Sequence, residues 1–271
     1  MATGWNEKRV GRPLAVVTGA SSGIGRELAK ELARRGYDLF LCAGSSSLIR
    51  VSSEVTELGA AVVGSINSDL SNSDGVENVA QEIERIGRPV EVLAINAGVG
   101  VGGDFATETS LDDELNVIFV NVVSSVHLSK LLLEDMVAQG SGYVLFTGSI
   151  AGLMPTPLEA VYGATKAFIN SFAESLRNEL RDQGVHVTAL LPGATETNFF
   201  KRAGMEDTPV GRGKKDDPAE VARDGLDALF NEKDKVVAGS LKTRAQAMLS
   251  DVLPDKIKAA VHRKQAEPSE R

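Results

Sequence analysis

The chain has a single cysteine, which excludes a disulfide framework. That residue, Cys42, stands within an apolar run. The sequence also lacks an uninterrupted apolar stretch of the ~18–20 residues that a membrane span needs. Its N-terminal segment 1–13 has no apolar core of a secretory signal peptide. We therefore expect a soluble, cytoplasmic protein without a membrane partner.

An excess of positive charge is missing too. The chain has 29 Lys and Arg residues against 37 Asp and Glu residues, a formal net charge of −8, and its basic residues are scattered. Because nucleic acids bind concentrated basic surfaces, we expect no nucleic-acid partner. The histidines, His127, His186 and His262, do not have the spacing of metal ligands, so no metal site is predicted.

Short apolar runs alternate with longer helical patterns along the 271 residues. The runs are rich in Val, Ile and Leu, which is typical of strands buried on both faces of a parallel sheet. Helices are expected between them, such as Gly25–Arg35 and Leu158–Asp182. Repeated βα units predict an α/β fold, a Rossmann-like, doubly wound parallel sheet flanked by helices. The seven predicted strands are Leu14–Thr18, Asp38–Ala43, Ala61–Ile66, Val90–Ile95, Gly142–Thr147, His186–Leu191 and Lys235–Ala238.

No linker, repeat or low-complexity segment divides the chain before the tail after Gln265. We therefore expect a single domain, 1–271, with a core at about 14–239. The polar segment Asn198–Asp217 is long for a loop in a compact domain, which indicates a lid or disorder. The extension 241–271 is expected to be helical or partly disordered, and its place at an interface, over the site or simply on the core stays open.

A glycine-rich turn, Thr18–Gly25 (TGASSGIG), follows the first predicted strand and opens a helix. Gly19 permits a tight turn, Gly23 lets the backbone approach a pyrophosphate, and Gly25 lets the helix lie close to the sheet. The helix N-terminus offers free N–H groups and a positive dipole end. The spacing differs from GxGxxG, but the strand–turn–helix context predicts a nucleotide phosphate site.

The segment after the second strand, Cys42–Ser47, contains neither an acid nor an arginine. An acid there would bond the ribose of NAD and repel the 2′-phosphate of NADP. Serines, Ser45 among them, can hydrogen-bond a phosphate, and Arg26 or Arg50 could reach it. The missing acid slightly favours NADP over NAD.

Tyr162 and Lys166 are four residues apart, so they share one face of a predicted helix. A free tyrosine has a pKa of ~10, and a neighbouring ammonium lowers that pKa toward the range useful for proton transfer. Ser149 follows a predicted strand, at the sheet edge where ligands bind in α/β folds. The alternatives are an incidental helical pair and, for Ser149, a helix N-cap or turn residue. An apolar stripe on the same helix faces away from Tyr162: Ala164, Phe168, Phe172, Leu176 and Leu180.

In this order and spacing, the motifs resemble the short-chain dehydrogenase/reductase family from Leu14 to about Gly239. The resemblance adds Asn121 to Ser149, Tyr162 and Lys166 as an active-site tetrad. It implies cofactor contacts by Gly19, Ser21, Ser22, Gly23, Ile24, Gly25, Ser45, Asp69, Leu70, Asn96, Ala97, Gly98, Tyr162, Lys166, Pro192, Gly193, Thr195 and Thr197.

The resemblance also implies roles. Tyr162 would be the general acid or base, Ser149 would polarise the substrate oxygen, and Lys166 would bond the nicotinamide ribose while lowering the pKa of Tyr162. Asn121 would anchor a water beside Lys166, and Asp69 would bond the adenine. The segment Asn96–Gly98 would support the sheet beside the cofactor, and the segment from Pro192 to Thr197 would hold the nicotinamide carboxamide. The alternatives are structural amides for Asn96 and Asn121 and a helix cap for Asp69.

The implied function is transfer of hydride between NADP, or NAD, and a ketone, aldehyde or secondary alcohol. Ala43 and Gly44 replace the residues with which family members select NAD or NADP, so cofactor choice stays open. The resemblance implies a homodimer or homotetramer built through Leu111–Gln139 and Leu158–Asp182. The alternative function is a non-catalytic nucleotide sensor or scaffold, which would have no need of the full tetrad.

Overall fold

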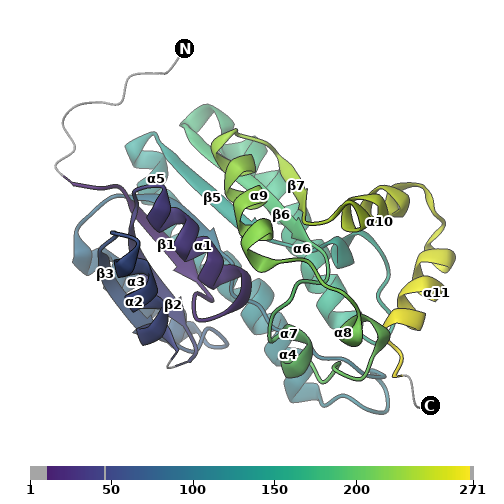
Figure 1. Ribbon diagram of the computed structural model, residues 1–271. Helices are drawn as coiled ribbons and strands as arrows, with labels where there is room; N and C mark the ends of the chain where they lie inside the picture. The colour runs from purple at the N-terminus through teal and green to yellow at the C-terminus, as the bar shows by residue number, and fades with distance from the viewer. Residues whose placement is uncertain (1–10, 46, 269–271) are drawn as a thin grey trace.

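The computed structural model describes residues 11–45 and 47–268. Its centre is a seven-stranded parallel sheet in the order β3-β2-β1-β4-β5-β6-β7 (Figure 1), which confirms the predicted doubly wound α/β fold. The order reverses between β1 and β4, and a ligand site is expected at the carboxyl ends of these strands. The strands are β1 Leu14–Thr18, β2 Asp38–Ala43, β3 Val62–Asn67, β4 Val90–Ile95, β5 Gly142–Thr147, β6 Val185–Pro192 and β7 Lys235–Ala238.

Helices cover both faces of the sheet. One apolar core joins the sheet to α1, α2 and α9, and the other joins it to α3, α5 and α6. Their bounds are α1 Gly23–Arg34, α2 Leu48–Glu57, α3 Ser73–Ile86, α4 Leu111–Ile118, α5 Ser124–Gln139, α6 Ala160–Leu180 and α9 Pro218–Phe230.

The central strands are buried on both faces as predicted, but the two edge strands are not. β3 contains only half-buried and exposed residues, and β7 is buried only at Ala238. Each edge strand has one neighbouring strand instead of two, so fewer elements cover it. The expectation of full burial is therefore wrong at both edges of the sheet.

The predicted long helix Leu111–Gln139 contains a π-helical turn at Phe119–Val123, between α4 and α5. By length and composition alone it could cross a membrane, contrary to the expectation that no segment is long and apolar enough. Its buried face, however, carries the polar side chains of Asn121, Ser124 and Ser125 and contacts α3 and the sheet. The helix therefore packs in the helical layer that covers one face of the sheet.

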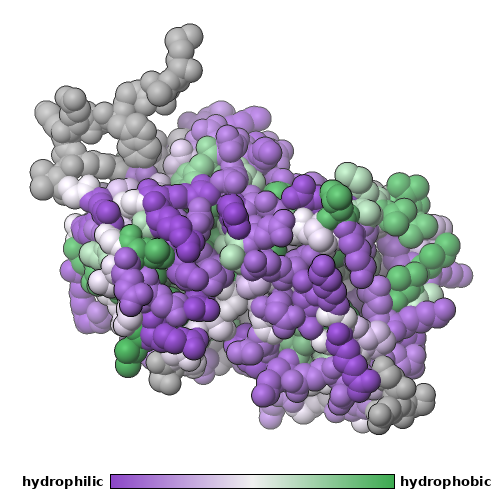
Figure 2. Space-filling model, in the orientation of Figure 1, coloured by the Kyte–Doolittle hydropathy of each residue, from purple (hydrophilic) through white to green (hydrophobic). Residues whose placement is uncertain are grey.

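The segment Asn198–Asp217 contains α7 (Phe199–Arg202) and α8 (Pro209–Arg212) and is not structureless. The C-terminal extension forms α10 (Leu241–Val252) and α11 (Asp255–Ala266). A small apolar core joins the two segments, because Ala266 packs with Phe200 and Met205. The outer side of the extension carries exposed apolar residues (Figure 2), namely Leu241, Met248, Leu249, Val252, Ile257 and Val261.

Candidate active site

The glycine-rich turn has the close backbone contacts expected of it. Gly19 and Gly23 have φ of +65° and +55°, in the left-handed region that favours glycine. A Cβ on Gly19 would lie 2.9 Å from the Cα of Ala97, and one on Gly25 would overlap the carbonyl oxygen of Gly19. A Cβ on Gly23 would lie 2.7 Å from the Cγ2 of Thr197. The turn therefore meets both the loop after β4 and the loop after β6.

The N-terminus of α1 is suited to an anion. The helix begins at Gly23, and its N-cap, Ser22, makes no side-chain capping hydrogen bond to any residue that the structure describes. No acidic side chain stands in the first turn. The first N–H groups and the positive end of the helix dipole are thus left for a phosphate, so the residues present fit a dinucleotide.

A cavity of about 440 Å³ opens beside this turn at the carboxyl ends of β1 and β4. Every site residue predicted from the sequence lines this cavity except Asn121. Asn121 is buried behind the wall, with 1% of its surface exposed. The loops after six strands, β1 to β6, thus bring together residues that are widely separated along the chain.

The floor of the cavity is held by Thr18, Asn96 and Thr147 from the ends of β1, β4 and β5. The Nδ2 of Asn96 donates to the carbonyl of Thr18 at 3.0 Å, and the backbone N–H of Asn96 donates to Thr18 Oγ1 at 2.9 Å. Thr147 Oγ1 donates to Asn96 Oδ1 at 3.1 Å. Asn96 therefore supports the sheet, and the side chain of Thr18 is a structural partner that the sequence analysis missed.

Asp69 does not cap the following helix. Its Oδ1 accepts a hydrogen bond from the backbone N–H of Ser71 at 2.9 Å, which lowers the pKa of this carboxyl below its ordinary value. The N-cap of α3 is Asn72, whose Oδ1 accepts from Gly75 N–H at 2.8 Å. An ionised Asp69 on the cavity wall can accept a hydrogen bond from a ligand.

The carboxamide of Asn121 makes structural contacts. Its Oδ1 accepts from the N–H of Val99 at 2.9 Å, and its Nδ2 donates to the carbonyl of Val99 and to Thr165 Oγ1. It thus joins the loop after β4 to α6. Asn121 lies in the π-helical turn, a distortion often found at functional sites. These hydrogen bonds support the structural role that the sequence left open for Asn121.

The hydroxyls of Ser149 and Tyr162 lie together. Ser149 Oγ accepts from the N–H of Ala151 at 3.0 Å, so it also acts as the N-cap of a short 3₁₀ turn. Burial raises the pKa of Tyr162, and the interaction with the Ser149 hydroxyl offsets only part of that rise. Lys166 Nζ donates to the carbonyl of Thr147 at 2.9 Å and lies 5.8 Å from the centre of the Tyr162 ring.

The electrostatics of this set differ from the expectation that Lys166 lowers the pKa of Tyr162. Burial first, and then the Glu159 carboxylate, raise the pKa of Tyr162 well above its ordinary value. Burial also lowers the pKa of Lys166 to about 8. In this geometry desolvation outweighs the attraction of the ammonium for a phenolate. Tyr162 is protonated at neutral pH and can donate a proton.

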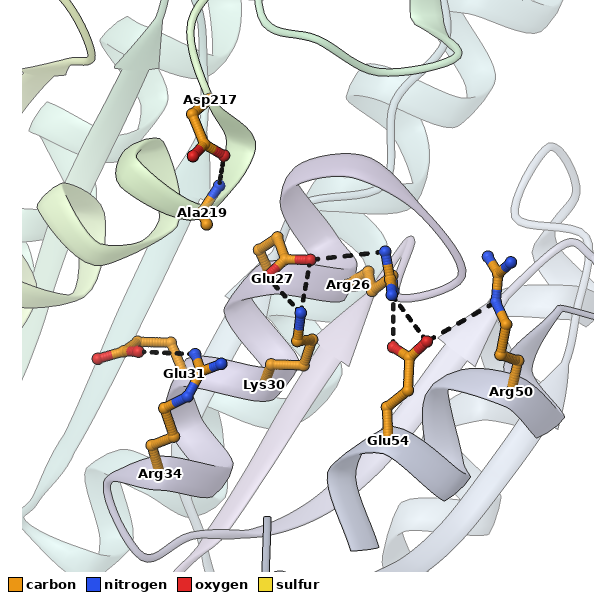
Figure 3. Close-up of polar contacts among 9 residues, drawn as sticks. All are labelled: Arg26, Glu27, Lys30, Glu31, Arg34, Arg50, Glu54, Asp217 and Ala219. Carbon is orange, nitrogen blue, oxygen red and sulfur yellow. Dashed lines mark hydrogen bonds and ion pairs between the residues drawn. The ribbon is translucent and has the colours of Figure 1, made fainter. Parts of the chain in front are cut away.

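The two arginines near the second strand are held by an acid that the sequence analysis missed. Arg26 donates to both carboxylate oxygens of Glu54 at 2.7 Å, and Arg50 lies 3.9 Å from the same carboxylate (Figure 3). The hydrogen bond from Arg26 lowers the pKa of Glu54. Ser45 lines the cavity, whereas Arg26, Arg50 and Glu54 do not.

Residues of the C-terminal extension also line the cavity. Gln246 of α10 and His262 and Gln265 of α11 take part in its wall, together with Glu159 at the start of α6. Neither spacing nor motif connects Gln246, His262 or Gln265 to Tyr162. The packing of α11 against α7 and α8 brings His262 and Gln265 to the site.

Comparison with known proteins agrees with this geometry. A profile of the short chain dehydrogenase family matches residues 13–207. The chain belongs to the short-chain dehydrogenase/reductase family. It is 31% identical over 257 residues to a dehydrogenase/reductase SDR family member 7B of Danio rerio, covering 89% of this chain and 82% of the relative. Members of the family are oxidoreductases, so the chain is placed among enzymes of that class.

Solved structures of the family share the fold. A short-chain dehydrogenase from Sphingobium yanoikuyae in complex with NADPH superposes with a TM-score of 0.77 at 28% identity, covering 89% of this chain and 96% of that one. A short-chain dehydrogenase/reductase from Burkholderia phymatum in complex with NAD gives a TM-score of 0.78 at 26% identity, covering 96% and 99%. Both neighbours are nicotinamide complexes, with different nucleotides.

Proposed function

We propose that this protein transfers hydride between a nicotinamide dinucleotide and a ketone, aldehyde or secondary alcohol. The observation that carries the proposal is the shared cavity: Ser149 and Tyr162 line the same space as the N-terminus of α1. The family and the two nicotinamide complexes among its solved structures support it.

The chain's own residues would hold the cofactor along the cavity. The free N–H groups at the start of α1 would receive the pyrophosphate, and Asp69 would accept from the adenine. The loop after β6 would hold the carboxamide, and Lys166 would bond the ribose beside the nicotinamide. The bound nicotinamide supplies or accepts the hydride.

Tyr162 and Ser149 would handle the substrate oxygen. Since burial keeps Tyr162 protonated, its hydroxyl can give a proton to a carbonyl oxygen during reduction. The Ser149 hydroxyl, hydrogen-bonded with Tyr162, would donate to the same oxygen and stabilise its developing negative charge. Reduction is therefore the direction that this protonation state favours at neutral pH. Phe199, Met154 and Val99 line the same cavity, so the substrate would be at least partly apolar.

For the cofactor we favour NADP over NAD, because Ala43 and Gly44 at the end of β2 present no carboxylate to repel a 2′-phosphate. Glu54 opposes this preference by engaging Arg26 and Arg50.

Thermal unfolding with NADPH, with NADH and with neither tests the cofactor preference, since a ligand of the folded state raises the Tm by mass action. A larger shift with NADPH is expected. No shift with either nucleotide at millimolar concentration would contradict the proposed function, and binding without turnover of any carbonyl would favour a nucleotide sensor or scaffold.

We further propose a cytoplasmic homodimer or homotetramer built through α4, α5 and α6. Leu115, Phe119 and Val123 repeat every four residues and are 38–42% exposed, and Phe168 on α6 is 42% exposed. The apolar stripe on α6 is exposed at Phe168 but buried at its C-terminal end, at Leu180.

Light scattering should give a dimer or larger for the wild type, and the double substitution Phe119→Asp with Phe168→Asp should give a monomer. A monomeric wild type would contradict the proposal.

A further inference from the structure

The two helices of the C-terminal extension are packed in the opposite sense to an ordinary surface helix. Such a helix buries its large apolar side chains and exposes its polar ones. On α10 the side chains of Thr243, Ala247 and Ser250 are buried, and all three are small. On α11 the side chains of Lys258 and His262 are only 13% and 11% exposed. The large apolar side chains of both helices are left to the solvent.

These side chains form what we call the outer apolar face of the extension. Leu241, Met248 and Val252 lie on one side of α10, because they are seven and then four residues apart, and they are 71–82% exposed. Side chains with this exposure protrude from the surface and do not line a groove. Figure 2 shows apolar side chains of both helices along one outer edge of the molecule. The outer apolar face comprises Leu241, Met248, Leu249, Val252, Ile257 and Val261.

Positive charge accompanies this face. The helices α10 and α11 contain six Lys and Arg residues against two Asp residues, whereas the whole chain has 29 Lys and Arg against 37 Asp and Glu. Lys242, Lys256 and Lys264 are exposed, and none of them forms an ion pair with another residue in the described part of the chain. Asp255 is paired with Lys258 at 2.7 Å. The extension is therefore locally basic on an acidic protein.

Hydrogen bonds hold the two helices in place. Thr243 Oγ1 donates to Asp216 Oδ2 at 2.5 Å, a buried contact that joins α10 to the segment containing α7 and α8. Lys258 Nζ donates to the carbonyl oxygen of Ser250 at 3.1 Å, which joins α11 to α10. The outer apolar face thus belongs to a folded element of the domain.

The charge argues against a second copy of this chain as the occupant of the face. In a two-fold contact the same patch meets itself, so the lysines of one copy would lie near those of the other. A tight protein contact also needs a hollow that matches each protruding side chain. A lipid bilayer accepts protruding apolar side chains without a matching hollow, and anionic headgroups supply the opposite charge.

We propose that α10 and α11 bind the surface of an anionic lipid bilayer. The outer apolar face inserts among the lipids, ~5–10 Å into the boundary between headgroups and acyl chains, and the lysines lie at the headgroups. Cytoplasmic leaflets carry anionic lipids, so this contact is compatible with a cytoplasmic protein. Lipid binding by the extension goes beyond the proposed hydride transfer and does not depend on it.

The proposal departs from the expectation that the protein has no membrane partner. That expectation rested on the net charge of the whole chain and on the length of its apolar runs. Neither property concerns a peripheral contact made by two helices, because such a contact depends on the local charge and on the apolar side chains that those helices expose.

Sedimentation of the full-length protein with lipid vesicles tests the proposal. One set of vesicles is equimolar phosphatidylserine and phosphatidylcholine, and the other is phosphatidylcholine alone. The wild type should bind the anionic vesicles more tightly, and added salt should weaken that binding because it screens exposed charges. The triple variant Lys242→Gln, Lys256→Gln and Lys264→Gln should lose about a hundredfold in affinity for the anionic vesicles.

The contribution of the apolar face is tested with the double variant Met248→Gln and Val252→Gln. It should bind the anionic vesicles at least about tenfold more weakly, because both side chains lose their transfer from water into lipid. Since both side chains are exposed, the variant should unfold at the wild-type temperature. Ile49→Gln is the matched control: Ile49 is 79% exposed on α2, on the other side of the molecule in Figure 1, and its loss should leave vesicle binding unchanged.

Three results would overturn the proposal. The first is a wild type that does not bind the anionic vesicles, and the second is a Met248 and Val252 double variant that binds them as tightly as the wild type. The third is a smaller assembly in light scattering for this double variant than for the wild type, because a second copy would then cover the face. None of these measurements uses nucleotide or turnover, so they leave the proposed hydride transfer to its own tests.

Discussion

Lys166 donates a hydrogen bond through Nζ to the carbonyl oxygen of Thr147, at 2.9 Å. The ammonium is thereby fixed at the end of β5, on the floor of the cavity. Because the residue is 5% exposed, burial lowers the pKa of Lys166 to about 8. Folding therefore carries a cost for holding this charge out of water.

The cost predicts how stability depends on pH. Below about pH 8 Lys166 is protonated in both states and the full cost applies. Between about 8 and the ordinary pKa of 10.5 the unfolded chain binds more protons, so the free energy of unfolding rises with pH. Lys166→Met should be more stable than wild type at pH 7, by on the order of 3 kcal/mol, and should lack this rise. Urea unfolding from pH 7 to 10 measures the stability difference at pH 7 and the rise with pH. If the free energies of unfolding of wild type and variant changed with pH in parallel, the account would be contradicted.

Gly25→Ala should damage both stability and nucleotide binding. Its Cβ would overlap the carbonyl oxygen of Gly19, so the turn would have to move, at a cost of about 1–3 kcal/mol. Gly36→Ala is the matched control: its φ is +89°, but its Cβ would meet nothing within 4 Å. The control should lose about 1 kcal/mol of stability while keeping its nucleotide affinity. Equal nucleotide affinity in the two variants would show that the turn does not hold the phosphates.

Removal of the Glu54 carboxylate should strengthen the preference for NADPH. Glu54→Gln removes the carboxylate that engages Arg26 and Arg50, so that either arginine could pair with a 2′-phosphate instead. The ratio of Kd for NADH to Kd for NADPH should rise roughly tenfold, which is a coupling of about 1.4 kcal/mol. Glu57→Gln, an exposed change on the same helix, should leave the ratio unchanged. An unchanged ratio in Glu54→Gln would mean that neither arginine reaches the ribose.

The strands could be predicted from the sequence to within a residue or so at each end. Apolar runs bounded by Gly, Pro or Asp are a strong signal where both faces are buried, as in Val90–Ile95. The π-helical turn at Phe119–Val123 could not be predicted, because one extra residue in a turn leaves the apolar pattern of a long helix almost unchanged. The structure within Asn198–Asp217 was missed because the small core around Phe200 and Met205 is completed by Ala266 of α11, which lies far along the chain.

The candidate site also has parts that the sequence predicts and parts that depend on packing. Tyr162, Lys166 and the glycine turn are local motifs, and their spacing places them on a helix face and at a helix start. The direction in which Lys166 donates and the burial of Tyr162 depend on packing, so the expected lowering of the pKa of Tyr162 was wrong for this geometry. Contacts such as that of Glu159 with His262 join distant parts of the chain. No spacing rule relates them.

The central claim is that Tyr162 transfers a proton during nicotinamide-dependent carbonyl chemistry. The most direct measurement compares wild type and Tyr162→Phe in the carbonyl-dependent loss of NADPH absorbance, with the nucleotide-induced rise in Tm measured on both proteins. The account predicts that the variant keeps the Tm rise and loses about 10²–10⁴-fold in turnover. Turnover close to the wild-type value in the Tyr162→Phe variant would contradict it.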